Sequence, residues 1–411
     1  MMIYIVVFLS GYLFMNFSDI ARVRNNGVAS GISAIIAVLI PALVSGLRDP
    51  TVGTDTQGYM YDIFAETVAE RRGPIAIYNA FGGDYQLGYV SLAQVSRLMP
   101  TFNAFLFITA FLTFGVAATA LKLFSARHAA VSYLVYLLLT FNQSMNNSRQ
   151  SVAVSFGLLL AVALLRRKRV VGILALAGAY LFHKTGLILL AYLPIYCITE
   201  WRRRYRPVEQ SRTNFWRNLL ILGSIVSMVG VVIEFQLLGP RLLSVLGFEQ
   251  DYGVYLESYR AGVPIYLAVG QGVFVIFAYH CRRLGRGGYF LLLAVTYGGI
   301  MFFLTDISVY MYRVSMYFTT LLTLACANTY MEGSLETTSP GGDPLASSHT
   351  HVHATFSGSE PFLSRHVRKR NGGIFGRELV VLVCAALWYI QIVVWDNHGT
   401  YPYTSSILGI G

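Results

Sequence analysis

Long runs of apolar residues, separated by short polar stretches, set the pattern of this chain. The runs are continuous and do not alternate with polar residues, which favours helices over the strands of a transmembrane barrel. A helix needs about 20 apolar residues to cross a bilayer, and fewer where the protein thins the membrane or lines a pocket. The sequence therefore predicts about twelve spans, near residues 1–17, 28–47, 102–121, 129–141, 150–165, 170–182, 186–200, 217–238, 263–281, 289–304, 310–330 and 378–395.

The composition favours an all-α, polytopic membrane protein. Hydrophobic residues make up 55% of the 411 residues and charged residues only 12%, and the mean hydropathy is +0.55. So few polar residues cannot cover the surface of a soluble globule of this length. We expect residues 1–411 to form a single polytopic transmembrane domain.

The basic residues indicate how the chain is oriented in the membrane. The first apolar run has no basic stretch before it and no small-residue cleavage site after it, so it reads as an anchor and not as a removed signal peptide. Arg22 and Arg24 follow this run, and the positive-inside rule then predicts that the N- and C-termini lie outside. Most basic clusters, such as residues 166–169, fall inside. The net charge of +11 therefore reflects topology and contact with anionic lipids, and no nucleic-acid binding is expected.

Two segments interrupt the pattern of spans. Residues 48–101 form the longest outer loop, in which we expect one amphipathic surface helix over residues 55–70 and a second helix or re-entrant segment over 85–99. Residues 331–377 are poor in apolar residues and rich in Ser, Thr, Gly, Pro and His, which predicts a disordered cytoplasmic loop. The alternating histidines at 349–353 lie in this flexible loop, so we do not interpret them as a metal site.

Two polar tips between short apolar runs are the strongest candidates for chemistry. Arg149 lies in a tip rich in asparagine and glutamine, and His183 and Lys184 form the tip of the next hairpin. An ionisable group near the hydrocarbon edge costs several kcal/mol unless it faces a wet cavity or a partner, so the default interpretation is functional. The alternatives are an arginine that reaches lipid phosphate and a histidine that only completes a hydrogen bond.

Further polar residues are expected on the outer side. Arg48 follows the second span, and Asp55 begins the predicted surface helix; a simple helix cap would also explain this aspartate. Arg260 lies in a loop rich in tyrosine, which an interfacial aromatic belt would also explain. Arg313 begins a span, where an ion pair with Asp306 that only locks the turn is the alternative.

The chain resembles the EpsG family of bacterial exopolysaccharide proteins, which are related to Wzy-type O-antigen polymerases. The resemblance runs from about residue 45 to the C-terminus, apart from the variable loops. The ordered set of R-x3-VGTDT-x2-Y, an SRQ-like segment and HK-[ST]-[AG] carries it; Gly186 stands where alanine is more frequent. The matching stretches are LRDPTVGTDTQGY, YQLGYVSLAQVSRLM with FNAFLFITA, MNNSRQSVAVSF, AYLFHKTGLILLAYLPIY, YRVSMYF and YPYTSSIL.

The resemblance implies a membrane glycosyltransferase of the type C class, in the bacterial cytoplasmic (inner) membrane. Such a polymerase moves a growing glycan from its lipid pyrophosphate onto the non-reducing end of an incoming lipid-linked repeat unit at the outer face. Arginines suit the pyrophosphate, and a carboxylate or imidazole suits the acceptor hydroxyl. We assign catalysis to Arg149, His183, Asp55 and Arg313, and substrate binding to Arg48, Thr54, Tyr59, Lys184, Arg260 and Tyr312.

The expected partners are an undecaprenyl-pyrophosphate-linked oligosaccharide, membrane lipids and a chain-length regulator. No acidic cluster calls for a metal, and no cofactor is expected. The alternatives are an O-antigen ligase or O-acetyltransferase, and, outside the enzyme class, a lipid-linked glycan flippase or export subunit. A flippase would carry its cations in a central cavity open to both faces, whereas here they fall in outer loops.

Overall fold

A computed structural model shows the arrangement of the helices. It describes residues 1–69, 73–80, 86–99, 101–204, 264–282, 287–306, 309–335 and 372–411. Within these residues regular structure is helical, and the only β pairing is an isolated bridge between Ser405 and Ile410. The expected all-α fold is confirmed for this part of the chain.

The α-helices have the following bounds: α1 Met2–Val23, α2 Gly27–Gly46, α3 Tyr61–Ala69, α4 Pro74–Ala80, α5 Leu87–Val95, α6 Phe102–Phe124, α7 Ala130–Asn146, α8 Ser148–Leu165, α9 Arg169–Phe182, α10 Tyr192–Arg204, α13 Ile265–Cys281, α14 Gly288–Phe303, α15 Val309–Thr319, α16 Leu322–Leu335 and α17 Gly372–Trp388. Two short 3₁₀ segments lie at Ser96–Leu98 and Leu304–Asp306, a longer 3₁₀ segment spans Lys184–Ala191, and two π-helical segments cover Thr56–Met60 and Tyr389–Val394.

Five of the described helices are long and apolar enough to cross a membrane: Met2–Val23, Gly27–Gly46, Phe102–Phe124, Ser148–Leu165 and Gly376–Val394. Shorter apolar helices accompany them, at Arg169–Phe182, Lys184–Thr199, Ile265–Cys281 and Gly288–Phe303. Large apolar side chains on their outer faces are exposed, for example Val170, Ile173 and Leu174 of α9. Such faces need an apolar solvent, so the fold is that of a membrane protein.

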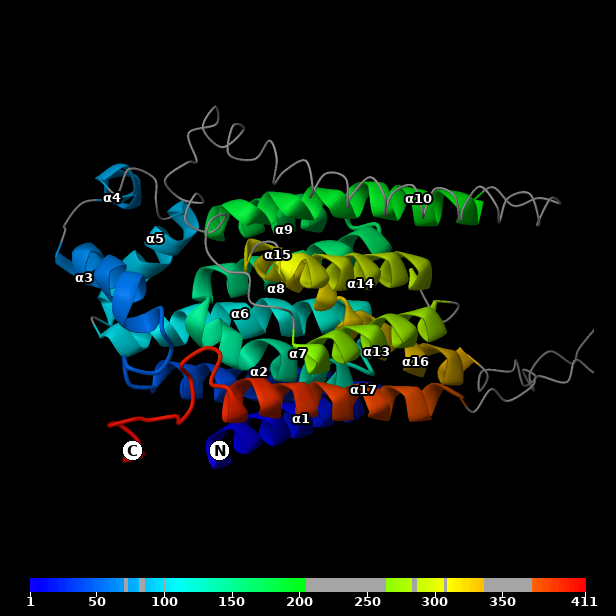
Figure 1. Cartoon of the computed structure of the whole chain (residues 1–411), viewed down its shortest axis with the longest axis horizontal. Helices are drawn as coiled ribbons and strands as arrows, with labels where there is room; N and C mark the ends of the chain where they lie inside the picture. Colours follow the sequence, from blue (N-terminus) through cyan, green and yellow to red (C-terminus); the bar gives the residue numbers. More distant parts are fainter. Residues whose placement is uncertain are drawn as a thin grey trace, which may run out of the picture.

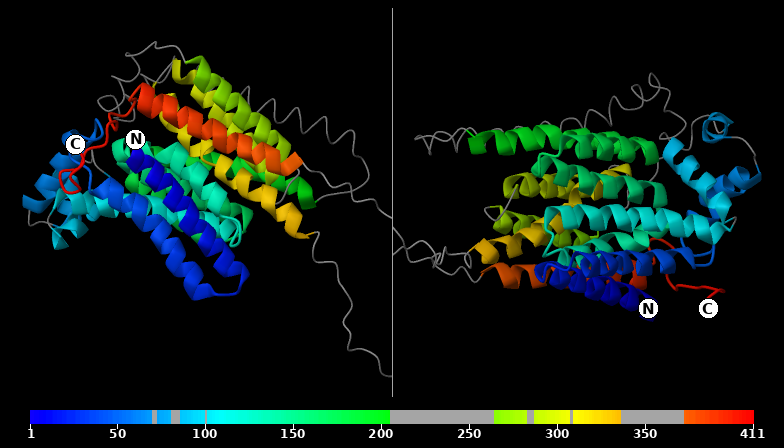
Figure 2. Two further views of the ribbon diagram at one scale, coloured as in Figure 1. Left: turned by 90° about the horizontal axis from the view of Figure 1, so that it is seen from below. Right: turned by 180° about the vertical axis from the view of Figure 1, so that it is seen from behind.

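Both chain termini lie at one end of the helix bundle, together with α3, α4 and α5 (Figure 1). The C-terminal end of α16 and the N-terminal end of α17 lie at the opposite end. The same arrangement is visible from behind and from below (Figure 2). The short helices α3–α5 therefore form a cap over one end of the bundle, called the cap below.

An apolar cluster of its own anchors the cap. On α3, Ile63 and Phe64 are buried, whereas Asp62 and Glu66 are exposed, so this helix presents one apolar face. Its neighbours in the cluster come from the cap and from the long helices α6, α8 and α9: Met60, Ile77, Tyr89, Val90, Ala93, Phe102, Phe105, Leu106, Val152 and Phe182. The cap is thus packed onto the bundle by side chains and not only tethered to it.

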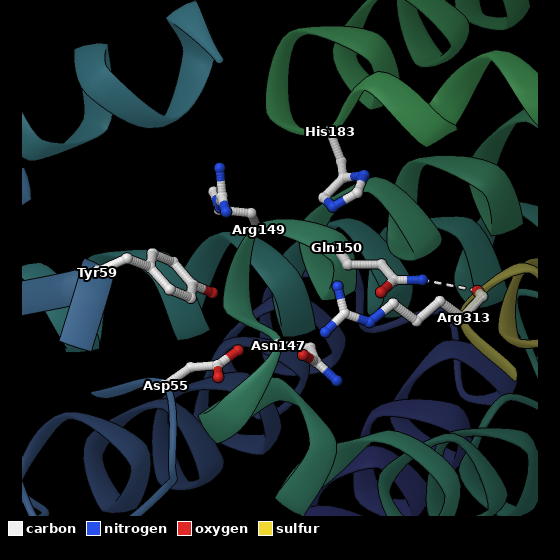
Figure 3. Close-up of a pocket in the computed structure, with 7 residues that line it drawn as sticks. All are labelled: Asp55, Tyr59, Asn147, Arg149, Gln150, His183 and Arg313. Carbon is white, nitrogen blue, oxygen red and sulfur yellow. Dashed lines mark hydrogen bonds between the residues drawn. The ribbon is translucent and has the colours of Figure 1, made fainter. Parts of the chain in front are cut away.

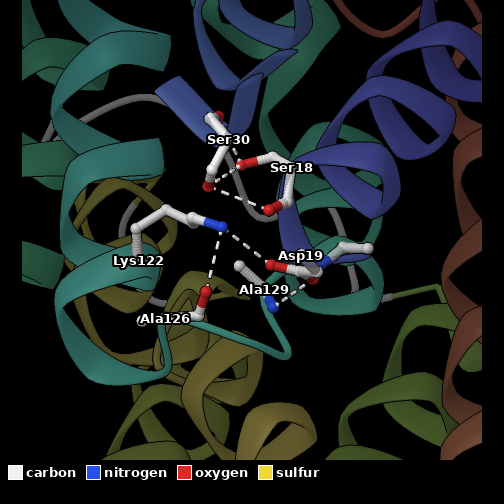
Figure 4. A network of polar contacts seen from close by, with 7 residues as sticks. Ser18, Asp19, Ser30, Lys122, Ala126 and Ala129 are labelled. Carbon is white, nitrogen blue, oxygen red and sulfur yellow. Dashed lines mark hydrogen bonds and ion pairs between the residues drawn. The ribbon is translucent and has the colours of Figure 1, made fainter. Parts of the chain in front are cut away.

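A buried polar network joins three helices away from the cap (Figure 4). One carboxylate oxygen of Asp19 on α1 pairs with Lys122 Nζ of α6 at 2.9 Å. The other oxygen accepts the backbone N–H groups of Ala129 and Ala130, at 2.7 and 2.9 Å. Asp19 therefore caps the N-terminus of α7, where a carboxylate is favoured by the exposed amides and by the helix dipole.

Three sequence-based boundaries need correction. The expected span near 310–330 is divided into α15 and α16. The expected disordered loop 331–377 is helical at both ends, because α16 continues to Leu335 and α17 begins at Gly372; residues 336–371 lie outside the described residues. The expected span near 186–200 is not one regular helix but a 3₁₀ segment followed by α10. The expected span near 217–238 also lies outside the described residues.

Candidate functional site

A polar pocket of about 130 Å³ lies beside the cap, at the end of the bundle that holds both termini, and Figure 3 shows the side chains that line it. It is partly open and draws its lining from residues 48–60, the start of α8, the tip after α9 and the start of α15. The lining residues are Asp55, Tyr59, Asn147, Arg149, Gln150, His183 and Arg313. All four residues that the sequence assigned to catalysis thus share one pocket, although they are up to 258 positions apart, counting 313 − 55.

Arg149 lies in the first turn of α8, where the chain reverses direction between two helices. Only Asn147 separates α7 from α8, and the first turn of α8 carries no acidic residue. The guanidinium lies 4.4 Å from the centre of the Tyr59 ring and donates to Gln86 Oε1 at 3.3 Å. An arginine together with a helix N-terminus concentrates positive potential, so this side of the pocket suits an anion.

Gln150 fixes the position of Arg313 relative to Arg149. Its Nε2 donates to the backbone carbonyl of Arg313 at 2.6 Å, which ties α8 to α15. The side chain of Gln150 is buried, and its Oε1 has no hydrogen-bond donor within the described part of the chain. A buried acceptor without a donor is costly, so a hydroxyl group of a ligand would be a favourable partner here.

Asp55 contributes the only carboxylate among the residues that line the pocket. Its side chain forms no helix-capping hydrogen bond, so the simple cap is excluded. Desolvation raises the pKa of Asp55 above its usual range, and the charges of Arg313 and Arg149 act in the opposite direction. A carboxylate with a raised pKa is a stronger proton acceptor, which is what a general base requires.

The loop that presents Asp55 is held from several sides. Asn146 Oδ1, at the end of α7, accepts both the Asp55 backbone N–H and the Thr54 hydroxyl at 2.8 Å. Gly53 has φ of +97° and donates to the Gly399 carbonyl at 2.6 Å. An added Cβ at Gly53 would meet the Met145 carbonyl oxygen at 3.0 Å. The glycine of VGTDT is therefore required by both its φ and its close approach to α7.

His183 ends α9, and its ring points into the pocket (Figure 3). Nδ1 accepts the Thr185 backbone N–H at 3.3 Å and contacts Thr185 Oγ1 at 2.6 Å. Burial, together with the charges of Arg149, Arg313 and Lys184, lowers the pKa of His183 to about 3. The imidazole is therefore neutral at physiological pH and binds a proton weakly.

The tip after His183 is shaped by a close backbone contact. A Cβ at Gly186 would meet backbone atoms of Ala179 and Tyr180 at 2.7 to 2.9 Å. The 3₁₀ segment thus folds directly onto the last turn of α9, and glycine allows this approach. A 3₁₀ run of eight residues is unusually long.

Arg48 lies elsewhere than the sequence predicted. It is 2% exposed and does not line the pocket. Its guanidinium donates to the carbonyl oxygens of Ser45, Val52 and Met145 and to the hydroxyls of Ser45 and Thr56. Arg48 therefore holds the Asp55 loop against the end of α7. It is not placed to bind substrate, because its donors already have protein acceptors.

The other residues predicted to bind substrate differ in position. Tyr59 lines the pocket, whereas Thr54, Lys184 and Tyr312 are not among the residues that line it. Thr54 instead bonds to Asn146, and Tyr312 accepts a weak hydrogen bond of 3.4 Å from Gln143. Lys184 acts on the pocket through its charge, which lowers the pKa of His183. Arg260 lies outside the described residues.

Sequence reasoning did not assign four residues that the geometry brings into the site. Asn147 and Gln150 line the pocket, and their place in the NNSRQ run beside Arg149 is a signal for them. Thr185 bonds to His183, and its hydroxyl lies 2.9 Å from the Tyr317 hydroxyl. Arg313 and Tyr317 are four residues apart on α15, so both lie on one helix face. This spacing is the feature of the sequence that could have indicated Tyr317 as a residue near the site.

Comparison with protein families gives one match. The match covers residues 31–335, which include every residue that lines the pocket. Searches of curated proteins and of solved structures return no match. Since the matched range is about three quarters of the 411 residues, the chain belongs to the EpsG family.

Proposed function

We propose that the protein is a polysaccharide polymerase that acts on lipid-pyrophosphate-linked glycans at the outer face of the membrane. The observation that carries the proposal is the pocket in which Arg149, Arg313, His183 and Asp55 meet at one end of an apolar helix bundle. Membership of the EpsG family, which is associated with polymerases of the glycosyltransferase kind, supports the same reaction.

The proposed topology extends the described helices to about twelve spans in a type C-like arrangement, in the cytoplasmic membrane. The N-terminus, the C-terminus and the cap then lie outside. Their common position at one end of the bundle supports this orientation (Figure 1). The basic stretch 166–169 connects the other ends of α8 and α9, as the positive-inside rule requires of a cytoplasmic turn.

In the proposed reaction, the acceptor hydroxyl of one repeat unit attacks the anomeric carbon of the donor glycan. The bond between this carbon and the pyrophosphate oxygen breaks, and the lipid pyrophosphate leaves with the electron pair. Asp55 receives the hydroxyl proton, for which its raised pKa is suited. Arg149 and Arg313 stabilise the negative charge on the leaving pyrophosphate, and such preorganised charges are worth about 10²–10³-fold in rate per group.

The proposed substrate is an undecaprenyl-pyrophosphate-linked oligosaccharide, and a chain-length regulator is a proposed partner. A lipid carrier is consistent with the position of the pocket beside exposed apolar residues of α9 and the 3₁₀ segment, such as Leu181 and Leu187. An isoprenoid chain at this boundary would remain in lipid while its pyrophosphate reaches the arginines.

The test is the size distribution of surface polysaccharide in a deletion strain that carries wild type, Arg149→Lys, Arg149→Ala, Arg313→Gln or Asp55→Asn at matched membrane levels. The exposed basic residue Arg22, on the other side of the bundle, gives the control Arg22→Gln. We expect wild type and the control to restore long polymer, and Arg149→Ala, Arg313→Gln and Asp55→Asn to leave single repeats.

Two outcomes would contradict the proposal. Long polymer in all three of these site variants would remove the pocket from the reaction. Complete loss of surface glycan in the deletion strain, in place of single repeats, would indicate a flippase. Arg149→Lys separates charge from geometry, because lysine keeps the charge but cannot present two parallel donors to a phosphate; we expect intermediate polymer lengths.

A further inference from the structure

We propose that Thr185 and Tyr317 are positioning residues that hold the His183 ring as a hydrogen-bond donor toward the substrate, so that His183 does not act as the base. The inference rests on the proposed function and specifies the chemistry of its site. It differs from the sequence-based assignment, in which His183 and Asp55 were equal candidates for the base.

The direction of the hydrogen bonds follows from one backbone group. The Thr185 N–H is 3.3 Å from His183 Nδ1 and can only donate, so Nδ1 must be an acceptor. The Thr185 hydroxyl, 2.6 Å from the same nitrogen, must then donate to it as well. Because its only proton is engaged in this hydrogen bond, the Thr185 hydroxyl must accept from the Tyr317 hydroxyl at 2.9 Å.

This chain of donors fixes the tautomer of the ring. A neutral imidazole whose Nδ1 accepts carries its proton on Nε2. Nδ1 is turned toward Thr185, so Nε2 is the nitrogen that the ring presents to the pocket (Figure 3). An Nε2–H group can donate to a phosphate or sugar oxygen, but it cannot accept a proton from a hydroxyl.

The surroundings of the His183 ring also favour the neutral imidazole with its proton on Nε2. Thr185 and Tyr317 are both buried, with exposures of 7% and 0%, so water does not compete for their hydroxyls. The charged groups that face the ring are Arg149 from α8, Arg313 from α15, the adjacent Lys184, and Asp55 across the pocket. Three cations against one carboxylate oppose protonation of the ring. Asp55 is then the one group of the pocket lining that is suited to accept the proton.

The test compares two amides at position 183. In His183→Gln the side-chain amide reaches the place of Nε2 and can donate, whereas in His183→Asn it reaches only the place of Nδ1. Neither amide can act as a base. The substrate is the pool of lipid-linked repeat units extracted from the deletion strain, and the readout is the initial rate of polymerisation by purified protein.

We expect His183→Gln to keep a rate within about tenfold of wild type, and His183→Asn and His183→Ala to fall by about 100-fold or more. The acid limb of the pH–rate profile should remain in His183→Gln, because it reports Asp55. Equal inactivity of Gln, Asn and Ala, in proteins with unchanged thermal unfolding, would overturn the donor role. Loss of the acid limb in His183→Gln would also overturn it and make His183 the base.

The positioning role of the hydroxyls has a separate readout. Thr185→Val removes the hydroxyl but keeps the shape, and we expect a rate about tenfold lower, restored by Thr185→Ser. Tyr317→Phe should have a smaller effect, because the Thr185 hydroxyl can still donate to Nδ1. In the His183→Gln background the cost of Thr185→Val should disappear. A cost of the same size in both backgrounds would mean that Thr185 only stabilises the fold and would overturn the positioning role.

Failure of this inference is distinguishable from failure of the proposed function. If Asp55→Asn and Arg149→Ala abolish polymerisation while His183→Gln does so too, the pocket is the polymerase site and only the donor role is wrong. If Asp55→Asn and Arg149→Ala leave polymer length unchanged, the proposed function itself is wrong.

Discussion

The backbone N–H of Asp55 donates to the side-chain oxygen of Asn146 at 2.8 Å. This bond joins the outer loop to the end of α7, one residue before the break that starts α8. Asn146, which also accepts the Thr54 hydroxyl, is therefore one of the contacts that place the carboxylate relative to Arg149. The shape of the pocket depends on this joint, the hydrogen bonds between residues 54–55 and Asn146, as much as on the charged groups themselves.

Arg48 belongs to the same joint, and we expect Arg48→Ala to act through stability. The substitution removes the guanidinium donors of the buried carbonyls of Val52 and Met145 and leaves both to share the single hydroxyl of Thr56, which should cost about 3 kcal/mol. Thermal unfolding in detergent measures this effect. Arg48→Lys should recover only part of it, because lysine lacks the planar fork. An Arg48→Ala protein with wild-type stability and no polymerase activity would instead indicate direct contact with substrate.

The pH dependence of the reaction should report Asp55. Its pKa is raised above 3.8 by desolvation, so the carboxylate is protonated at a higher pH than an ordinary aspartate. The rate should therefore fall on the acid side, as pH decreases through this raised value. Arg313 lowers the pKa of Asp55, so removing its charge should move the acid limb to higher pH.

The measurement is the pH profile of the residual initial rate of purified Arg313→Gln, which should be about 10²–10³-fold below wild type, normalised to its own maximum. Arg22→Gln carries the same charge change on an exposed residue away from the pocket and should leave the limb unmoved. If the acid limb lies at the same pH in both variants, it does not report the ionisation of Asp55. The contribution of Asp55 to folding stability should change with pH in the opposite direction to the rate. A carboxyl group with a raised pKa favours the folded state at low pH.

Much of the site is recoverable from the sequence because polar residues stand out against apolar runs. Arg149 and His183 interrupt such runs, and the structure brings both to one pocket with Asp55 and Arg313. The actual partners of Arg48 could not be predicted, because three of its acceptors are backbone carbonyls, which every residue has. The contact of Thr185 with Tyr317 spans 132 residues, and no periodicity reports such a pairing.

In the fold, too, some features can be predicted from the sequence and others cannot. The α-helical, membrane-spanning character follows from composition, but the exact form of the short spans does not. The expected helix near 186–200 begins as a 3₁₀ segment, because Gly186 lies against the backbone of Ala179. A tertiary contact of this kind overrides local propensity. The ends of α16 and α17 similarly extend into a stretch whose composition alone indicated disorder.

We expect Gly186→Ala to impair both stability and activity. Its methyl group would lie 2.7 Å from the Ala179 backbone, and relief requires a shift of the 3₁₀ segment that follows His183. Such overpacking costs about 1–3 kcal/mol, and the shift should displace the His183 ring. The control is Gly31→Ala in α2, where nothing lies within 4 Å of the added Cβ; it should be neutral or about 0.5–1 kcal/mol more stable. Unchanged polymer length and melting temperature in Gly186→Ala would refute the tight contact.

The network around Asp19 provides a way to separate loss of stability from loss of the site. Asp19→Asn removes the ion pair with Lys122 and weakens the cap of α7, which should cost about 1–3 kcal/mol, similar to Gly186→Ala. Asp62→Asn, on the exposed face of α3, should cost less than about 1 kcal/mol, because its carboxylate only interacts with the dipole at the first turn of the helix. Because the network lies away from the pocket, Asp19→Asn should lower the melting temperature while the protein that remains folded makes polymer of normal length. Short polymer in this variant, at matched membrane levels, would mean that stability alone sets product length. The activity losses expected for Gly186→Ala could then no longer be attributed to the position of His183.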